Sequence, residues 1–463
     1  MEHMTLYEWT HGWPVFALGL GMIFSVALYF LFSRVRGEAY KRGSRILEGR
    51  AAHREKARLR RRGRGNLSLA GVTLTLQDEM KHFKLIGTTG TGKSTAIAEL
   101  LGEALERGDR AVVADPHGGY LKRFHDRYRG DVILNPFEPG SVKWDLFREI
   151  HNPYDVEELA SGLVPSTEDA SSREWRGYAR TFLTAVTRRC HEAGQRDPAE
   201  LWRLLAMAPA EELRSLVAGT PAQPFLDPEN ARMFGSVRSV TGSAIAALEY
   251  VQAQRAAFFS VRDWVKNGRG VLFIPYQAKQ VAALRSIIST WVRLAIFEAM
   301  SQPEGDQRLW FIVDELDALG VIDGLKDALA RLRKFGGRCV LGFQSIAQVS
   351  STYGNGDART IVENCGNTLI FRCSASEGGG TSRFASQLIG EREIVRRQTT
   401  RSRDRMGFFS NNGLRRSTQI SQQHVREAAV MPSELEQLPD LTGYLKTASS
   451  PAWIRVSFRQ PSR

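Results

Sequence analysis

Residues 87–95, Gly-Thr-Thr-Gly-Thr-Gly-Lys-Ser-Thr, lie between two stretches of different periodicity. The short apolar run Phe83–Ile86 precedes them and predicts a buried strand, whereas Ala96–Arg107 follows with a helical pattern. A glycine-rich turn between a strand and a helix brings backbone N–H groups and the positive end of the helix dipole to one point. The spacing Gly-x4-Gly-Lys-Ser therefore predicts a loop that surrounds phosphate oxygens.

We expect this loop to bind ATP together with Mg²⁺. In such a pattern Lys93 reaches the β- and γ-phosphates, and the hydroxyl of Ser94 is a ligand of Mg²⁺. The other loop residues expected at the site are Gly87, Thr88, Thr89, Gly90, Thr91, Gly92 and Thr95. The alternative is a chance match in a Gly/Thr-rich turn, but both flanking elements stand where the mechanism needs them.

A second stretch, Leu309–Glu315, reads as five apolar residues followed by two acids. It predicts a buried parallel strand that ends in carboxylates at the sheet edge where ligands bind. We expect Asp314 to hold Mg²⁺ and Glu315 to polarise the attacking water. A strand that is merely capped by surface acids is the alternative.

Two further predicted strands end in polar residues. Cys339–Phe343 is followed by Gln344, which can contact the γ-phosphate and report hydrolysis, or can simply begin the next helix. Ala111–Asp115 also ends in an acid. Asp115 either helps to organise Mg²⁺ and water or caps the following turn, and the residues favour neither.

The chain has 463 residues and a net charge of +13, of which residues 34–64 carry +10. Residues 65–463 carry only +5, so the bulk charge is weak support for a nucleic-acid partner. The four cysteines are scattered without C-x-x-C spacing, which predicts reduced thiols and no zinc site.

Residues 15–32 form an uncharged apolar run of 18 residues, about 27 Å long as a helix. The basic cluster follows the run, which disfavours a cleaved signal peptide and predicts one span with its N-terminus outside. We therefore expect an N-terminal segment at 1–33 with a transmembrane helix and a basic juxtamembrane linker at 34–66. The linker is expected to face water or anionic lipid, with DNA second.

The remaining chain predicts an α/β domain, formed by 67–149 and 263–463, with an inserted all-α domain at 150–262. Strand-like runs are absent from the insertion, and apolar residues recur there at spacings of three and four. Val72–Leu76 alternates as a strand, Val281–Met300 predicts a long helix, and Thr368–Cys373 predicts a late strand that carries Arg372 near its end. The basic segment 391–423 is expected to be an exposed loop or hairpin.

An ordered set of motifs resembles the type IV secretion coupling proteins of the TraD/TrwB kind. The motifs extend over nearly all of residues 80–446 and are GTTGTGKST (87–95), ADPHGGYLKRF (114–124), ILNPF (133–137), LWFIVDELDALG (309–320), GFQSIAQVSSTYG (342–354) and VMPSELEQLPDLTGYL (430–445). The P-loop alone would indicate only an ATPase, whereas the ordered set is specific to this family.

The resemblance implies a RecA-like P-loop NTPase domain in a homohexameric ATPase of the bacterial inner membrane. Such a protein moves relaxase-bound, single-stranded DNA toward the channel proteins of a type IV secretion system during conjugation. By resemblance, Lys93, Ser94, Asp314, Glu315 and Gln344 take the roles given above. A neighbouring subunit is expected to complete each site with an arginine, for which Arg372 is our candidate.

Two other functions remain open from the residues. A duplex DNA translocase of the chromosome-segregation kind shares the motor and is disfavoured by the helical insertion. A receptor that recruits relaxase or protein effectors would use ATP only for assembly.

Overall fold

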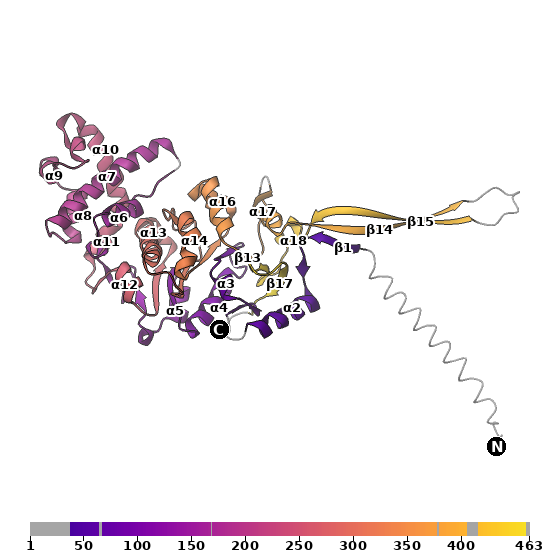
Figure 1. Cartoon of the computed structure of the whole chain (residues 1–463). Coiled ribbons are helices and arrows are strands. Elements are labelled where there is room, and N and C mark those ends of the chain that lie inside the picture. Colours follow the sequence, from indigo (N-terminus) through magenta and orange to yellow (C-terminus); the bar gives the residue numbers. More distant parts are fainter. Residues whose placement is uncertain (1–37, 64–66, 168, 377–378, 405–414, 460–463) are drawn as a thin grey trace, which may run out of the picture. The chain divides into compact units, whose positions relative to one another are not determined.

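The computed structural model describes residues 38–63, 67–167, 169–376, 379–404 and 415–459 (Figure 1). The apolar run expected to span the membrane, residues 15–32, lies outside them. The chain divides into two compact units, one of residues 1–45 and 387–430 and one of residues 46–386 and 431–463. The expected four-part division stays a prediction.

The larger unit is organised around a ten-stranded sheet. Its strands are, in spatial order, β2 (Ile46–Leu47), β17 (Trp453–Ser457), β16 (Thr442–Lys446), β13 (Asn367–Ile370), β5 (Phe83–Ile86), β12 (Gly337–Phe343), β11 (Leu309–Val313), β6 (Arg110–Pro116), β10 (Val271–Tyr276) and β7 (Val132–Ile133). Neighbours from β13 to β7 run parallel, whereas β16 is antiparallel to both of its neighbours. The expected α/β fold is therefore present.

Strands β5, β12, β11 and β10 are buried along their whole length, as expected for a parallel sheet covered on both faces. The apolar pattern of these strands has a charged exception, the buried Lys84 of β5. Its Nζ donates to the carbonyls of Val362 (2.9 Å) and Cys365 (2.6 Å) at the end of α16 (Asn355–Asn364). The Trp310 side chain of β11 is fully buried, and its Nε1 donates to Asp109 at 2.8 Å. These pairings satisfy the Lys84 ammonium and the Trp310 indole N–H inside the sheet.

The other helices of this unit follow or connect its strands. They are α2 (Gly49–Arg62), α3 (Leu76–Glu79), α4 (Lys93–Glu106), α5 (Gly119–Phe124), α12 (Val261–Asn267), α13 (Ala278–Ser301), α14 (Leu325–Leu332), α15 (Ile346–Tyr353) and α18 (Pro432–Glu436). In the described part of the chain, α13 is the helix long and apolar enough to cross a membrane. It is mostly buried against α6, α12 and α14, so its composition fits a core helix.

The prediction of a strand at Val72–Leu76 was wrong for most of its length. Only Val72–Thr73 forms a strand, β4, which pairs with β3 (Ser68–Leu69). The chain then turns into α3, because Thr75 caps this helix. The Thr75 side chain accepts from the Asp78 N–H at 3.1 Å, and Asp78 accepts from the Thr75 N–H at 3.0 Å. This reciprocal capping favours a helix over the strand that the alternation of apolar and polar residues at 72–76 predicted.

A helical segment is inserted between β7 and β10. Its helices are α6 (Asp155–Leu163), α7 (Ala170–Glu192), α8 (Pro198–Ala206), α9 (Ala210–Leu216), α10 (Ala231–Ile245) and α11 (Ala247–Ala253). The segment begins after β8 (Lys143–Trp144) and ends before β9 (Phe258–Phe259), and these two short strands pair in parallel. Phe182 and Phe234 pack edge to face inside it, with ring centroids 5.3 Å apart.

The smaller unit contains a three-stranded antiparallel sheet in the order β1 (Glu38–Gly43), β14 (Glu391–Asp404) and β15 (Arg415–Ala428). The basic segment that was expected to be a loop or a hairpin is a hairpin. Its two strands have 14 residues each, and Glu391 pairs with Ala428 at the base. Helix α17 (Gly380–Ile389) leads into β14.

Candidate functional site

The loop at 87–95 connects β5 to α4, as its flanking pattern predicts. Gly90 and Gly92 have φ angles of 78° and 121°, a region that residues with a side chain rarely adopt. A Cβ at Gly87 would lie 2.7 Å from the Cβ of Phe371. The loop is fixed further by the Thr88 N–H, which donates to the Arg372 carbonyl at 2.9 Å. Glycine is therefore required where the loop is tightest.

The Lys93 side chain lies within the predicted phosphate-binding loop. This side chain is buried, and Nζ donates to the carbonyls of Gly87 (2.6 Å) and Thr88 (3.2 Å). Burial lowers the pKa of Lys93, whereas the charges of Asp314 and Glu315 act in the opposite direction. The ammonium is thus held close to both acids, in the place where a phosphate chain would need a cation.

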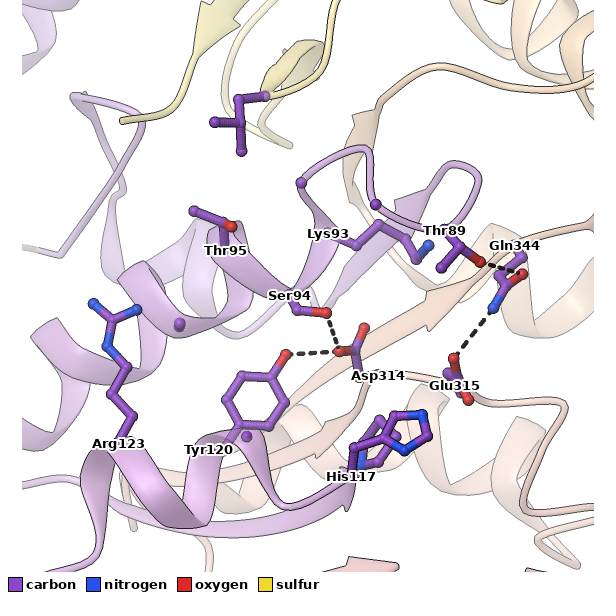
Figure 2. Close-up of a pocket in the computed structure, with 16 residues that line it drawn as sticks. Thr89, Lys93, Ser94, Thr95, His117, Tyr120, Arg123, Asp314, Glu315 and Gln344 are labelled. Carbon is purple, nitrogen blue, oxygen red and sulfur yellow. Dashed lines mark hydrogen bonds between the residues drawn. The ribbon is translucent and has the colours of Figure 1, made fainter. Parts of the chain in front are cut away.

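Ser94 and Asp314 come together at the end of β11. The Ser94 hydroxyl donates to Asp314 Oδ2 at 2.6 Å, and the Tyr120 hydroxyl donates to the same oxygen at 2.7 Å (Figure 2). Burial, together with the charge of Asp314, raises the pKa of Tyr120 well above its usual value, so the phenol stays a donor. Asp314 Oδ1 is buried and has no hydrogen-bond partner among the described residues.

Glu315, Gln344 and Thr89 form a chain of hydrogen bonds across the pocket. The Gln344 amide donates to Glu315 Oε1 at 3.1 Å, and its carbonyl oxygen accepts from the Thr89 hydroxyl at 3.0 Å (Figure 2). Gln344 follows β12, which lies between the strand of the P-loop and the strand of the acids. The amide therefore connects the carboxylate at 315 to the phosphate loop.

These residues line one pocket of about 420 Å³. Its lining residues are Thr89, Gly90, Gly92, Lys93, Ser94, Thr95, Ala98, Pro116, His117, Gly119, Tyr120, Arg123, Asp314, Glu315, Gln344 and Leu441. His117, Tyr120 and Arg123 line the pocket but were not among the predicted site residues. Their shared signal was the conspicuous segment 114–124 directly after a strand that ends at the ligand edge.

Asp115 caps the turn, the second of its two predicted roles. Its carboxylate accepts from the backbone N–H groups of Tyr120 (3.2 Å) and Leu121 (2.7 Å), at the start of α5. Burial raises the pKa of Asp115 to about 6, against these hydrogen bonds. Because both carboxylate oxygens are occupied, Asp115 fixes the segment that carries Tyr120.

Arg372 lies two residues beyond the end of β13 and does not line the pocket. Its guanidinium pairs with Asp440 at 2.7 Å and donates to the Leu438 carbonyl at 3.3 Å. The side chain is 37% exposed. A role for Arg372 in a neighbouring subunit's site stays a prediction.

The donor set fits one hard cation beside bound phosphates. Ser94 and Asp314 offer a hydroxyl and a carboxylate oxygen, and Mg²⁺ takes few protein ligands while phosphates and waters complete its shell. No group of three or more His, Cys, Asp or Glu residues that could hold a metal ion occurs in the described residues. The four cysteines are buried free thiols.

A parallel sheet with a glycine-rich loop after one strand, and acids after a strand two places away, defines a P-loop nucleoside triphosphatase fold. The chain belongs to the family of the type IV secretion-system coupling protein DNA-binding domain, whose sequence model matches residues 66–459. The family suggested by the motifs is thereby confirmed.

Two relatives illustrate the likeness, one of them in two solved structures. Coupling protein TraD of Escherichia coli (strain K12) is 27% identical over 470 residues, which include 97% of this chain and 64% of TraD. The plasmid coupling protein TrwB, solved with the non-hydrolysable ATP analogue ADPNP, is 30% identical with a TM-score of 0.78, over 92% of this chain and 95% of TrwB. TrwB solved with ADP and Mg²⁺ is 31% identical with a TM-score of 0.78, over 91% of this chain and 94% of TrwB. The chain thus spans less than two thirds of the length of TraD.

Proposed function

We propose that this chain hydrolyses ATP with Mg²⁺ and couples hydrolysis to the movement of DNA toward a type IV secretion channel in conjugation. The observation that carries the proposal is the convergence of Lys93, Ser94, Asp314, Glu315 and Gln344 on one pocket. Membership of the coupling-protein family supports the DNA substrate, and the TrwB complexes with ADPNP and with ADP and Mg²⁺ support the ligands.

Each side chain has a defined role in this proposal. Lys93 binds the β- and γ-phosphates, while Ser94 and Asp314 hold Mg²⁺, which supplies charge neutralisation between the phosphates. Glu315 orients and polarises the attacking water, and Gln344 keeps the Glu315 carboxylate in hydrogen-bond contact with the loop. The other residues of the loop enclose the phosphates through their backbone N–H groups.

The deciding experiment measures ATP hydrolysis by the 463-residue chain at low salt, with and without single-stranded DNA. Lys93→Ala is expected to lose nucleotide affinity, whereas Glu315→Gln should bind ATP but lose DNA-stimulated hydrolysis and DNA transfer between cells. Glu304→Gln, the same change at an exposed acid just before β11, is the control. If Glu315→Gln still supports transfer, the chain is a substrate receptor that uses ATP for assembly.

Raised salt should weaken the stimulation of ATP hydrolysis by DNA, because protein contacts to DNA phosphates release counterions.

We propose that the chain forms a homohexamer in the bacterial inner membrane. One transmembrane helix at about residues 15–32 anchors each subunit, with the N-terminus outside and the nucleotide domain in the cytoplasm. Relaxase-bound DNA and the channel proteins are the proposed partners. A reporter fused to the N-terminus should be active only outside the cytoplasm, and activity inside would refute this topology.

Arg372 is proposed to complete the site of a neighbouring subunit. Loss of such an arginine costs about 10³ to 10⁵ in turnover. A mixture of Lys93→Ala and Arg372→Ala subunits should regain activity that neither variant has alone, since some interfaces then combine an intact lysine with an intact arginine. No recovery on mixing, or an active Arg372→Ala variant, would remove Arg372 from this role.

A further inference from the structure

Tyr120 is a buried residue near the start of α5, outside both the glycine-rich loop at 87–95 and the strand that ends in Asp314 and Glu315. It is 5% exposed, and its hydroxyl donates to Asp314 Oδ2, across 194 positions of sequence. The Ser94 hydroxyl donates to the same oxygen (Figure 2). Two hydroxyl donors on a single carboxylate oxygen fix both the position and the rotation of that carboxylate.

The second oxygen of the carboxylate has a different environment. Asp314 is 3% exposed, yet Oδ1 has no hydrogen-bond partner in the part of the chain that the structure describes. In Figure 2 it is the Asp314 oxygen that no dashed line reaches. A buried carboxylate oxygen without a partner is unfavourable by itself, so this atom is suited to a cation. Gly342 of β12 allows this close approach, because a Cβ there would lie 2.2 Å from the Asp314 carbonyl oxygen and 3.1 Å from Oδ1.

We propose that Tyr120 is the positioning residue of the metal-binding carboxylate. By occupying Oδ2 together with Ser94, its hydroxyl aims Oδ1 at Mg²⁺ and prevents the carboxylate from rotating when nucleotide leaves. The assignment rests on the proposed ATPase function. It also gives a reason for the capping by Asp115, which fixes the backbone of the turn that carries Tyr120.

The test measures the affinity of the full 463-residue chain for a fluorescent ADP derivative, in EDTA and across a Mg²⁺ titration. Tyr120→Phe removes one oxygen atom and leaves the ring. We expect the Mg²⁺ concentration at half-effect to rise about 10- to 100-fold, as for other partners of metal ligands. The affinity in EDTA and the unfolding midpoint should stay close to those of the unmodified chain.

Tyr276→Phe is the matched control. Tyr276 ends β10 and is equally buried, but its hydroxyl has no hydrogen-bond partner among the described residues. This variant should keep the original Mg²⁺ dependence. An unchanged Mg²⁺ titration for Tyr120→Phe would overturn the positioning role, and equal losses with and without Mg²⁺ would reduce Tyr120 to a structural residue. If the unmodified chain binds no nucleotide in either buffer, the proposed function itself fails together with this inference.

Discussion

Glu149 is a fully buried acid that joins the two ends of the helical segment. It precedes α6, yet most of its donors lie beyond α11: the Ser260 hydroxyl at 3.0 Å and the Val261 and Arg262 N–H groups at 2.7 and 3.1 Å. The Trp144 indole donates as well, at 2.8 Å. One carboxylate thus closes the base of a segment of about a hundred residues.

The charge state of Glu149 predicts a pH dependence of folding. Burial raises the pKa of Glu149 to about 7, from an ordinary value near 4.5. The folded state therefore favours the protonated acid. Protonated Glu149 therefore contributes to the free energy of unfolding, on the order of 3 kcal/mol in all. This contribution is fully present below about pH 4.5 and is lost as the pH rises through about 7. We expect the urea midpoint of the chain to fall between pH 5 and 8.

Glu149→Gln should flatten this slope, because the amide does not titrate. Glu229→Gln, at an exposed acid on the same segment, should retain the slope of the unmodified chain. Parallel pH profiles for the unmodified chain and Glu149→Gln would show that another group controls the stability in this range.

At the scale of elements, the Glu393 side chain attaches strand β1 to β14, in addition to the backbone hydrogen bonds between the two strands. Glu393 lies opposite Arg42 in the register, and its carboxylate contacts Lys41 Nζ at 3.1 Å, Arg42 Nε, and His424 Nδ1 of β15 at 3.1 Å. The hydrogen bond from Arg42, followed by that from Lys41, lowers the pKa of Glu393 to about 2. Glu393 therefore connects all three strands of the sheet.

We predict that Glu393→Gln speeds backbone deuterium exchange at Ala39 and Tyr40. The cause is the loss of the charge that holds the cationic side chains of β1 against β14. In the unmodified chain, protection of β1 should persist above about pH 4.5 and be lost as the pH falls toward 2, since the lowered pKa means that protonation is resisted in the fold. Glu427→Gln is the control, because Glu427 pairs with Arg392 and Arg396 and not with β1. Equal exchange rates in the two variants would contradict the prediction.

At the scale of the whole larger unit, a buried ionic cluster attaches the helical segment to the sheet. Arg262 of α12, 5% exposed, contacts Asp155 at 3.3 Å, Glu298 at 3.1 Å, and Glu158 of α6. Arg293 of α13 contacts Glu158 at 3.2 Å and donates to the Asp323 carbonyl at 3.1 Å. Asp323 belongs to the loop that follows Asp314 and Glu315, so the cluster connects α6 to that loop.

Arg262→Met is expected to lower the free energy of unfolding by about 3 to 5 kcal/mol, because it removes the buried cation that three acids of the cluster share. Denaturant unfolding of the full chain measures the loss. Lys266→Met is the matched control: Lys266 contacts the same Glu298 at 3.6 Å but is 35% exposed, and should cost less than about 1 kcal/mol. Similar losses in both variants would show that the cluster is not the main attachment.

The sequence by itself determined the features that depend on neighbours along the chain. The glycine spacing at 87–95, the strand that ends in Asp314 and Glu315, and the polar residue after the next strand each follow from local backbone geometry. The parallel order of the strands then brings their ends to one edge. The α3 turn could also have been predicted, since Thr75 and Asp78 have the spacing of a capping box.

Only the tertiary structure decided which distant groups share atoms. The hydroxyl of Tyr120 reaches Asp314, the amide of Gln344 bridges to Thr89, and β1 pairs with a hairpin about 350 positions further along the chain. The physical reason is that periodicity and spacing report burial and local conformation, whereas a side-chain hydrogen bond depends on positions within a fraction of an ångström, which packing alone sets.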